Sequence, residues 1–547
     1  MADFKDKVVY QIYPKSFRDS NGDGLGDIKG IIEKLDYLEA LGVDYIWITP
    51  FFPSPQRDNG YDVADYTSVD PRFGTMEDLE ELIAEADRRH MGIMLDMVFN
   101  HTSTQHKWFQ KALEGEKKYQ DYYIWREGTA DQLPTNWESK FGGPAWEYVP
   151  SLEKWYLHLF DITQADLNWE NPQVREELKN VIRFWKQKGI KGFRFDVVNL
   201  ISKPEIMEDD YEGDGRRFYT DGYHVHEFLK ELVRDTQIEN MITVGEMSST
   251  SLENCIRYSN PDEKELSMCF NFHHLKIDYK NGQKWELMEP DRKQLKNLFR
   301  IWQEGMQQEN GWNAVFWCNH DQPRIVSRLG DEGKYWKESA KMLAACIHLM
   351  RGTPYIYQGE ELGMTNPHYT AIDKYKDVES LNYYKILLDR GKSQQEALEI
   401  LAARSRDNGR SPVQWSSGRN AGFSDACPWI SLSDNWKEIN AEAQMWDETS
   451  ILAFYRRLIS LRKSMKIIQE GEIHFILNEE EQILAFERLW KNEHMIVLNN
   501  LSSEMVQIDF PDSWKKYHRL LGNYDGLNLQ NNYLVMRPYE TITLYKA

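Results

Sequence analysis

The sequence predicts a (β/α)8 barrel, and two observations support this fold. Eight short apolar runs, each long enough for one strand, recur along the first two thirds of the 547-residue chain, and most are separated by segments with apolar residues at three- and four-residue spacing. Three of these runs end on an acid: Asp196, Glu246 and Asp321. In such barrels the catalytic residues lie at the carboxyl ends of the strands.

The expected strands, in order, are residues 8–13, 45–49, 92–98, 192–198, 241–246, 266–270, 314–317 and 354–357. Helices are expected between them, for example over residues 30–41 and 76–89, where apolar residues recur on one face. The first three strands assign residues 1–101 to the first part of the barrel. The other five assign residues 169–466 to its second part, with a long excursion after strand 8.

Two segments depart from this rhythm. Residues 102–168 carry Trp, Gly and Pro clusters and no clear helix–strand unit, and they are too long for an ordinary connection. They therefore predict an inserted subdomain after strand 3, over the active face. Residues 467–547 show short alternating runs broken by Asn and Gly, which predict a C-terminal antiparallel β-sandwich domain.

Composition excludes several classes of partner. The net charge of −21, from 66 basic and 87 acidic residues, argues against nucleic acid or an anionic membrane surface as the main ligand. The N-terminus lacks the apolar segment of a secretion signal, and no apolar run is long enough to span a membrane. The five cysteines are scattered without metal-binding spacing, so we expect reduced thiols in a cytoplasmic protein. The sequence does not determine the oligomeric state, for which a monomer is favoured.

The three strand-end acids predict a glycosidase, which needs a pair of carboxylates and a helper. Asp196 and Asp321 each have an Arg or a His within two residues in the sequence. Arg194 precedes Asp196 by two residues, so both should face the same side of their strand, and Arg194 should keep Asp196 ionised. The alternative interpretation is that such acids merely cap the helices that follow.

Residues 96–101, 192–196, 319–321 and 352–360, together with Glu246, resemble the α-amylase family of retaining α-glucoside hydrolases (glycoside hydrolase family 13), and the similarity covers essentially the whole chain. The resemblance implies that Asp196 is the nucleophile and Glu246 the general acid and base. It implies that Asp321 binds ring hydroxyls more tightly in the transition state. A retaining pair should lie about 5–5.5 Å apart, and the pKa of Glu246 should be raised.

Residues 164–168 and 410–415 are similar to the α-glucosidases of this family that remove a single glucose. The resemblance implies that His101 and His320 bind the hydroxyls of that glucose. Asp58 and Arg410 would bind it near the 4-hydroxyl, while Tyr61 stacks on the ring. An Asn-Gly turn is the alternative interpretation of residues 58–62.

Residues 19–27 place oxygen-bearing side chains at alternate positions, as in the first part of an EF-hand loop, but lack its bidentate Glu. The resemblance implies one structural Ca²⁺ or Mg²⁺ and no cofactor for catalysis. Its ligands would be Asp19, Asn21, Asp23, the Leu25 carbonyl and Asp27. The alternative is a metal-free turn.

Residues 10–17, 213–219, 245–251 and 271–276 are similar to family members that cleave a phosphorylated disaccharide into glucose and glucose 6-phosphate. His273 and Lys276 stand where relatives with neutral substrates carry acids. The residues expected to hold the phosphate are His273, His274, Lys276, Lys284, Arg216 and Arg217.

Three alternatives remain. The basic residues just named could form only a solvated rim. Val197 resembles the residue of 1,6-selective glucosidases that act on neutral oligosaccharides. A catalytically dead binding protein is disfavoured because all three acids are present. The sequence does not decide between hydrolysis and glucosyl transfer.

Overall fold

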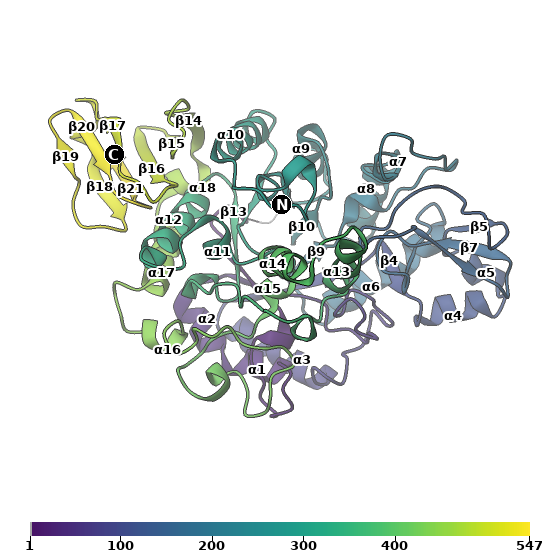
Figure 1. Ribbon diagram of the computed structural model, residues 1–547. Coiled ribbons are helices and arrows are strands. Elements are labelled where there is room, and N and C mark those ends of the chain that lie inside the picture. Colours follow the sequence, from purple (N-terminus) through teal and green to yellow (C-terminus); the bar gives the residue numbers. More distant parts are fainter. Residues whose placement is uncertain (1–2) are drawn as a thin grey trace.

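The computed structural model describes residues 3–547 and confirms the barrel (Figure 1). Eight parallel strands form one sheet in the order β11-β10-β9-β3-β2-β1-β13-β12. A parallel bridge between Cys269 and Asn313 joins the two ends of this order, so the sheet closes. The strands are β1 (Val9–Ile12), β2 (Tyr45–Ile48), β3 (Gly92–Met97), β9 (Gly192–Phe195), β10 (Ile242–Glu246), β11 (Met268–Phe270), β12 (Ala314–Val315) and β13 (Thr353–Tyr357).

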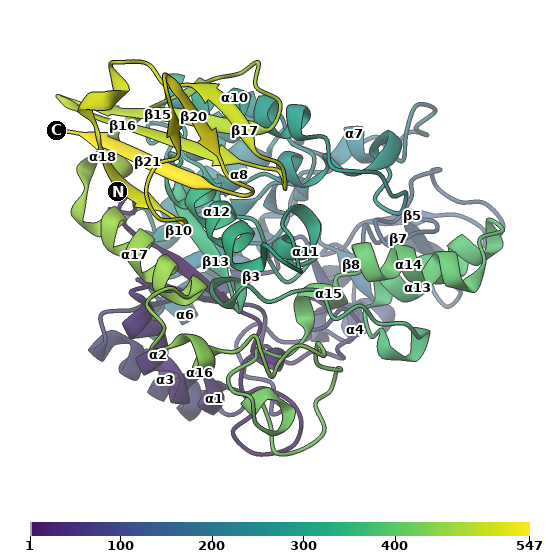
Figure 2. The ribbon, with the colours of Figure 1, turned by 60° about the vertical axis from the view of Figure 1, so that its left-hand side comes forward.

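Helices surround the barrel in Figures 1 and 2. The main ones are α3 (Met76–Arg88), α6 (Pro172–Gln187), α8 (Val225–Thr236), α9 (Leu252–Ser259), α10 (Arg292–Gln308), α12 (Trp336–His348) and α17 (Ile451–Ser464). The single helix predicted over residues 30–41 is wrong. Two helices, α1 (Ile28–Glu33) and α2 (Leu35–Leu41), meet there, because Lys34 has a non-helical ψ of 5°.

The segment between β3 and α6 contains two short helices, α4 (Lys107–Leu113) and α5 (Lys117–Gln120). Its strands are β4 (His101–Ser103), β5 (Trp125–Glu127), β6 (Trp146–Val149), β7 (Lys154–Leu157) and β8 (Gln164–Asp166). Trp137, Trp146 and Trp155 pack there in one cluster with Val197 and Leu200, which follow β9. The segment is therefore anchored on the chain just after the expected nucleophile.

A helical excursion follows β13. It comprises α13 (Val378–Asp389), α14 (Gln394–Arg404) and α15 (Asp407–Arg410). Arg406 and Arg410, at the end of this excursion, contact Asp321, which follows β12.

The C-terminal part forms two antiparallel sheets, in the orders β14-β15-β16-β21-β18 and β17-β20-β19. Their strands are β14 (Glu472–Ile476), β15 (Ile483–Trp490), β16 (Glu493–Asn500), β17 (Val506–Asp509), β18 (His518–Gly522), β19 (Leu529–Gln530), β20 (Tyr533–Met536) and β21 (Thr541–Lys546). An apolar cluster that includes Ile496, Ile508 and Leu534 fills the space between the sheets. Both ribbon views place these sheets at the opposite end of the molecule from β5 and β7.

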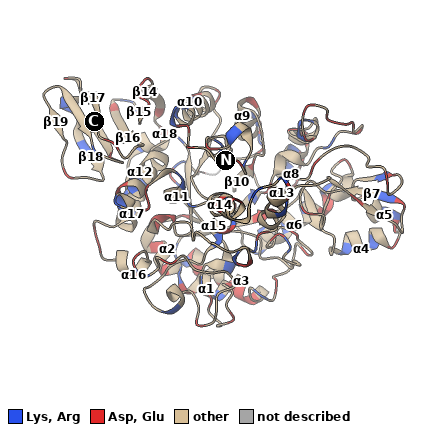
Figure 3. Ribbon diagram, viewed as in Figure 1, with Lys and Arg blue, Asp and Glu red and all other residues tan. Residues whose placement is uncertain are grey.

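Acidic and basic residues are interspersed along the ribbon (Figure 3). Within residues 3–547, no helix has the length and the apolar character that crossing a membrane would require.

Candidate active site

The three strand-end acids line one cavity of about 250 Å³. Asp196 follows the last residue of β9, Glu246 is the last residue of β10, and these two strands are neighbours in the barrel. Asp321 comes from the segment after β12. Parallel strands present their carboxyl ends on one face of a barrel, which brings together residues that are far apart in sequence.

Arg194 bridges the two acids expected to do the chemistry. Its Nη1 atom lies 2.7 Å from an oxygen of Asp196 and 2.5 Å from one of Asp96, while Nη2 contacts Glu246. Arg194 is only 1% exposed and does not line the cavity. It therefore acts on the carboxylates rather than on a substrate. One guanidinium that touches both acids places them close together, as a retaining mechanism requires.

The environment of Asp196 balances opposing effects. The pKa of its carboxyl is raised to about 6, because burial and the charge of Asp96 raise it more than Arg194 lowers it. The next residue, Val197, has a φ of 34° and a ψ of 39°, in the left-handed region that β-branched residues rarely adopt. Such strain costs about 1–3 kcal/mol. Here it turns the chain sharply just after Asp196.

Asp321 is held ionised. Arg410 donates to it over 2.7 Å and Arg406 over 3.4 Å. Burial alone would raise the pKa of this carboxyl, but His320 and those two arginines hold it well below its usual range. Asp321 can therefore accept hydrogen bonds from sugar hydroxyls throughout the neutral range.

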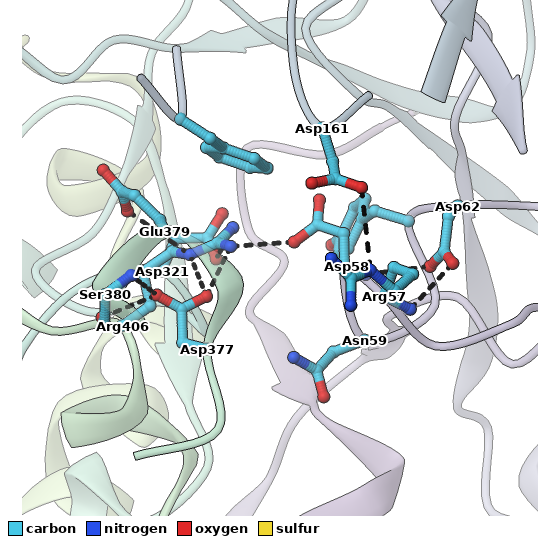
Figure 4. Close-up of polar contacts among 12 residues, drawn as sticks. Arg57, Asp58, Asn59, Asp62, Asp161, Asp321, Asp377, Glu379, Ser380 and Arg406 are labelled. Atoms are coloured by element: carbon cyan, nitrogen blue, oxygen red, sulfur yellow. Dashed lines mark hydrogen bonds and ion pairs between the residues drawn. The ribbon is translucent and has the colours of Figure 1, made fainter. Parts of the chain in front are cut away.

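Asp58 and Arg410 were both expected to bind the terminal glucose, but only Asp58 lines the cavity. Arg406 donates to Asp58 over 2.8 Å and lies between it and Asp377 (Figure 4). Arg410 is fully buried and instead contacts Asp321 and Asp377. The two arginines lie four residues apart, on and just before a single turn of helix, so the sequence alone could not show which of them faces the cavity. Burial raises the pKa of Asp58 to about 7.

Tyr61 and His101 both line the cavity, as expected. The Tyr61 hydroxyl donates to Asp96 over 2.9 Å, and His101 contacts the Tyr61 carbonyl over 3.2 Å. His320 is placed differently. It is fully buried, stacks on the Tyr61 ring at 5.0 Å, and lies 3.4 Å from Asp321. We expected His320 to bind a sugar hydroxyl directly. In the structure it instead packs against Tyr61 and Asp321 and supports their positions.

The residues expected to hold a phosphate separate into two groups. Lys276 and Lys284 line the cavity, and Lys284 lies 2.6 Å from Glu379. His273 and His274 do not reach it, which corrects the prediction. His274 contacts the Phe316 carbonyl over 2.9 Å, and His273 stacks on Trp302. They belong to a single short turn, η3 (His273–Leu275), which directs both of these rings into the protein.

Arg216 and Arg217 also lie outside the cavity lining. Arg216 pairs with Asp214, and Arg217 pairs with Asp210 and Glu212. Both arginines are about half exposed, so these contacts are weak.

Three further charged residues of the cavity wall were not among the sequence candidates: Lys140, Glu379 and Arg406. Arg406 could have been found, because it opens the same run as Arg410. Lys140 and Glu379 carry no motif that would identify them. They come from the inserted segment and from the excursion after β13.

The loop of residues 19–27 lies away from the cavity lining. Asp19 accepts from the backbone N–H groups of Asn21, Gly22 and Gly24, and Asp27 caps α1. Asn21 and Asp23 each accept one N–H and keep further lone pairs. The donor set is all oxygen, which fits Ca²⁺ or Mg²⁺.

In residues 3–547, no three His, Cys, Asp or Glu side chains are grouped to hold a metal. The expected site would therefore depend on Asn21 and on the Leu25 carbonyl as well.

A larger cleft of about 1070 Å³ lies beside the inserted segment, lined by residues such as Trp125, Lys154 and Tyr223. None of the three strand-end acids reaches it, so we assign the chemistry to the smaller cavity.

The comparisons agree with this geometry. The family model "Alpha amylase, catalytic domain" matches residues 11–471, and "Alpha-amylase SusG C-terminal domain" matches residues 483–543. The chain belongs to the α-amylase family of glycoside hydrolases.

Among individual relatives, the chain is 53% identical to a trehalose-6-phosphate hydrolase of Escherichia coli (strain K12), over 98% of each chain. It is 52% identical to the protein of the same name from Bacillus subtilis (strain 168), over 98% of this chain and 97% of that one. Identity to an oligo-1,6-glucosidase of Parageobacillus thermoglucosidasius is 45%, over 98% of each. The crystal structure of Bacillus licheniformis trehalose-6-phosphate hydrolase superposes with a TM-score of 0.94 at 52% identity, and each chain is fully covered.

Proposed function

We propose that this enzyme hydrolyses trehalose 6-phosphate to glucose and glucose 6-phosphate with retention of configuration. The observation that carries the proposal is a cavity with the bridged acids Asp196 and Glu246 in its lining and three lysines in the same wall, in a chain of net charge −21. The higher identity to trehalose-6-phosphate hydrolases than to oligo-1,6-glucosidases supports it.

In the first step, an oxygen of Asp196 attacks the anomeric carbon of the unphosphorylated glucose. Glu246 donates a proton to the bridging oxygen, the glycosidic bond breaks, and glucose 6-phosphate leaves. In the second step, Glu246 takes a proton from water, and the water oxygen displaces Asp196. Glucose is released as the α-anomer. The raised pKa of Glu246 and the separation of about 5–5.5 Å remain predictions.

The ion pair of Arg406 with Asp58 explains why a single glucose is removed. The two side chains lie 2.8 Å apart and both line the cavity. Arg406 would donate to a hydroxyl of the terminal glucose and Asp58 would accept from one, and these charge-assisted hydrogen bonds would fix its position. Asp321, beside Arg406, would bind the ring hydroxyls as the ring distorts toward the transition state.

The second candidate is a 1,6-glucosidase for neutral oligosaccharides, which Val197 in the cavity wall favours. Assaying one purified batch against trehalose 6-phosphate, trehalose and isomaltose separates the two. We expect kcat/KM to be highest for trehalose 6-phosphate by at least tenfold. Faster cleavage of isomaltose would refute the proposal.

We also propose a cytoplasmic, monomeric enzyme. Four of its five cysteines are buried free thiols, which fits a reducing compartment. One structural Ca²⁺ or Mg²⁺ in the loop of residues 19–27 completes the proposal. Asp19, Asn21, Asp23, the Leu25 carbonyl and Asp27 would hold it, and it would stabilise the loop without taking part in the reaction.

A further inference from the structure

Lys140 lies in the inserted segment, between β5 and β6, and its side chain lines the catalytic cavity. Its backbone is fixed on both sides. The Lys140 N–H donates to the Leu159 carbonyl, and the neighbouring Ser139 N–H donates to the Gly143 carbonyl. Phe141 and Phe160, which also line the cavity, are packed edge to face with ring centroids 5.6 Å apart. The lysine is therefore carried by an ordered part of the wall.

The position of its ammonium group relative to Glu246 is informative. Lys140 Nζ lies 3.3 Å from the hydroxyl of Ser248, which is two residues after Glu246, in the loop that follows β10. Glu246 is expected to protonate the oxygen that joins the two sugars, so groups just beyond it face the leaving sugar. In the proposed reaction that sugar carries the phosphate.

Two of the three lysines in the cavity wall have no ion-pair partner among the described residues. Over residues 3–547, Lys284 pairs with Glu379, whereas neither Lys140 nor Lys276 forms an ion pair with a carboxylate. The chain has 21 more acidic than basic residues, so two unpaired lysines on one cavity wall are unexpected. Lys140 is only partly exposed, and an unpaired cation in such a position is costly unless an anion compensates it.

The neighbours of Lys140 do not neutralise it. The pKa of its ammonium is lowered to about 8, mainly by burial, with Arg216 and Lys276 acting in the same direction and Asp214 and Asp166 opposing them. The other groups that face it are the ring of Tyr219 at 5.6 Å and the Ser248 hydroxyl. A bound dianion would add the missing negative charge.

We propose that Lys140 is a specificity-determining residue that binds the phosphate of the leaving sugar together with Lys276. This inference rests on the proposed function and adds to it a contact from the inserted segment. Lys140 and Lys276 come from different parts of the chain and line the same cavity. Two ammonium groups can share the three oxygens of one phosphate, each as a point charge.

The test compares Lys140→Met with Lys154→Met, a control in the same inserted segment whose lysine lines the other cleft. We expect Lys140→Met to lower kcat/KM for trehalose 6-phosphate by about 10- to 100-fold, the effect of one charge-assisted contact. A neutral aryl α-glucoside should be cleaved within about twofold of the wild-type rate. Inhibition of that neutral reaction by glucose 6-phosphate should weaken by a similar factor. Lys154→Met should change none of these values.

A pH profile adds a second measurement. Because the pKa of Lys140 is lowered to about 8, wild-type kcat/KM for trehalose 6-phosphate should fall above pH 8 more steeply than that for the aryl glucoside. Lys140→Arg keeps its charge there, so the extra fall should disappear.

Equal losses of Lys140→Met on both substrates, or no loss on trehalose 6-phosphate, would overturn the inference. A wild-type enzyme that does not cleave trehalose 6-phosphate would overturn the proposed function itself, so the two failures are distinguishable. Thermal unfolding of each variant shows whether a loss comes from misfolding.

Discussion

Replacing Arg194 with Met should move the acidic limb of the pH–activity profile toward neutral pH. Arg194 donates to Asp196 over 2.7 Å, and the pKa of Asp196 with this contact is about 6. A charge-assisted hydrogen bond is worth about 1.5–3 kcal/mol, and one pKa unit corresponds to about 1.4 kcal/mol. Losing the contact should therefore raise the pKa by about one to two units.

The sign follows from the chemistry. Only the ionised form of Asp196 can attack, so activity is lost as pH falls through its pKa. The limb of kcat/KM on a neutral aryl α-glucoside should lie near pH 6 in the wild type and about one to two units higher in Arg194→Met. The aryl glucoside is chosen because it carries no phosphate, whose own ionisation would overlap this range. Arg194→Lys retains the charge and should keep the limb near its original position.

The variant will also be less stable, since Arg194 is almost fully buried among three carboxylates and breaking such a network costs about 3–5 kcal/mol. Adding Asp96→Asn removes a negative charge that raises the pKa of Asp196, so the limb of the double variant should lie below that of Arg194→Met. An unchanged limb in folded Arg194→Met would refute the view that Arg194 sets the ionisation of the nucleophile.

The remaining predictions concern the nucleophile, the loop and the phosphate. Asp196→Asn should lose activity by several orders of magnitude without unfolding, because an amide cannot form the ester; rapid NMR of wild-type product should show α-glucose first, and β-glucose would rule out double displacement. Chelator and Asp23→Ala should each lower the melting temperature more than turnover at moderate temperature, since a ligand bound only to the native state stabilises it; an unchanged melting temperature would show that the loop is a metal-free turn. Lys276→Asp should lower kcat/KM for trehalose 6-phosphate by about tenfold or more while sparing a neutral aryl α-glucoside. Raising the salt concentration should weaken the apparent affinity for trehalose 6-phosphate but not for the neutral aryl α-glucoside. Equal effects on the two substrates would favour the 1,6-glucosidase.

The barrel and the three acids of its cavity could be predicted from sequence because the signals are local. Each barrel strand is a short apolar run, and the chemistry of a barrel lies where such runs end. Asp196, Glu246 and Asp321 were found in this way, and all three line one cavity. The break at Lys34 was missed because apolar periodicity continues from α1 into α2 and does not report a local change in backbone angles.

The rest of the site depends on which way each side chain points, and that is settled by packing between distant segments. Arg406 and Arg410 have the same chemistry four residues apart, yet only Arg406 reaches the cavity, because Arg410 is buried against Asp321 and Asp377. His274 turns toward the Phe316 carbonyl, while Lys276, two residues later, faces the cavity.

The sequence by itself therefore determined the class of fold, the three strand-end acids and the family, since these depend on residue type and local spacing. Only the tertiary structure decided which cations line the cavity. Lys140 reaches the cavity because the inserted segment packs against the chain after β9, and Glu379 reaches it from the excursion after β13. Such long-range placement has no period or motif in the sequence, because it arises from burial of apolar surface between segments far apart in the chain.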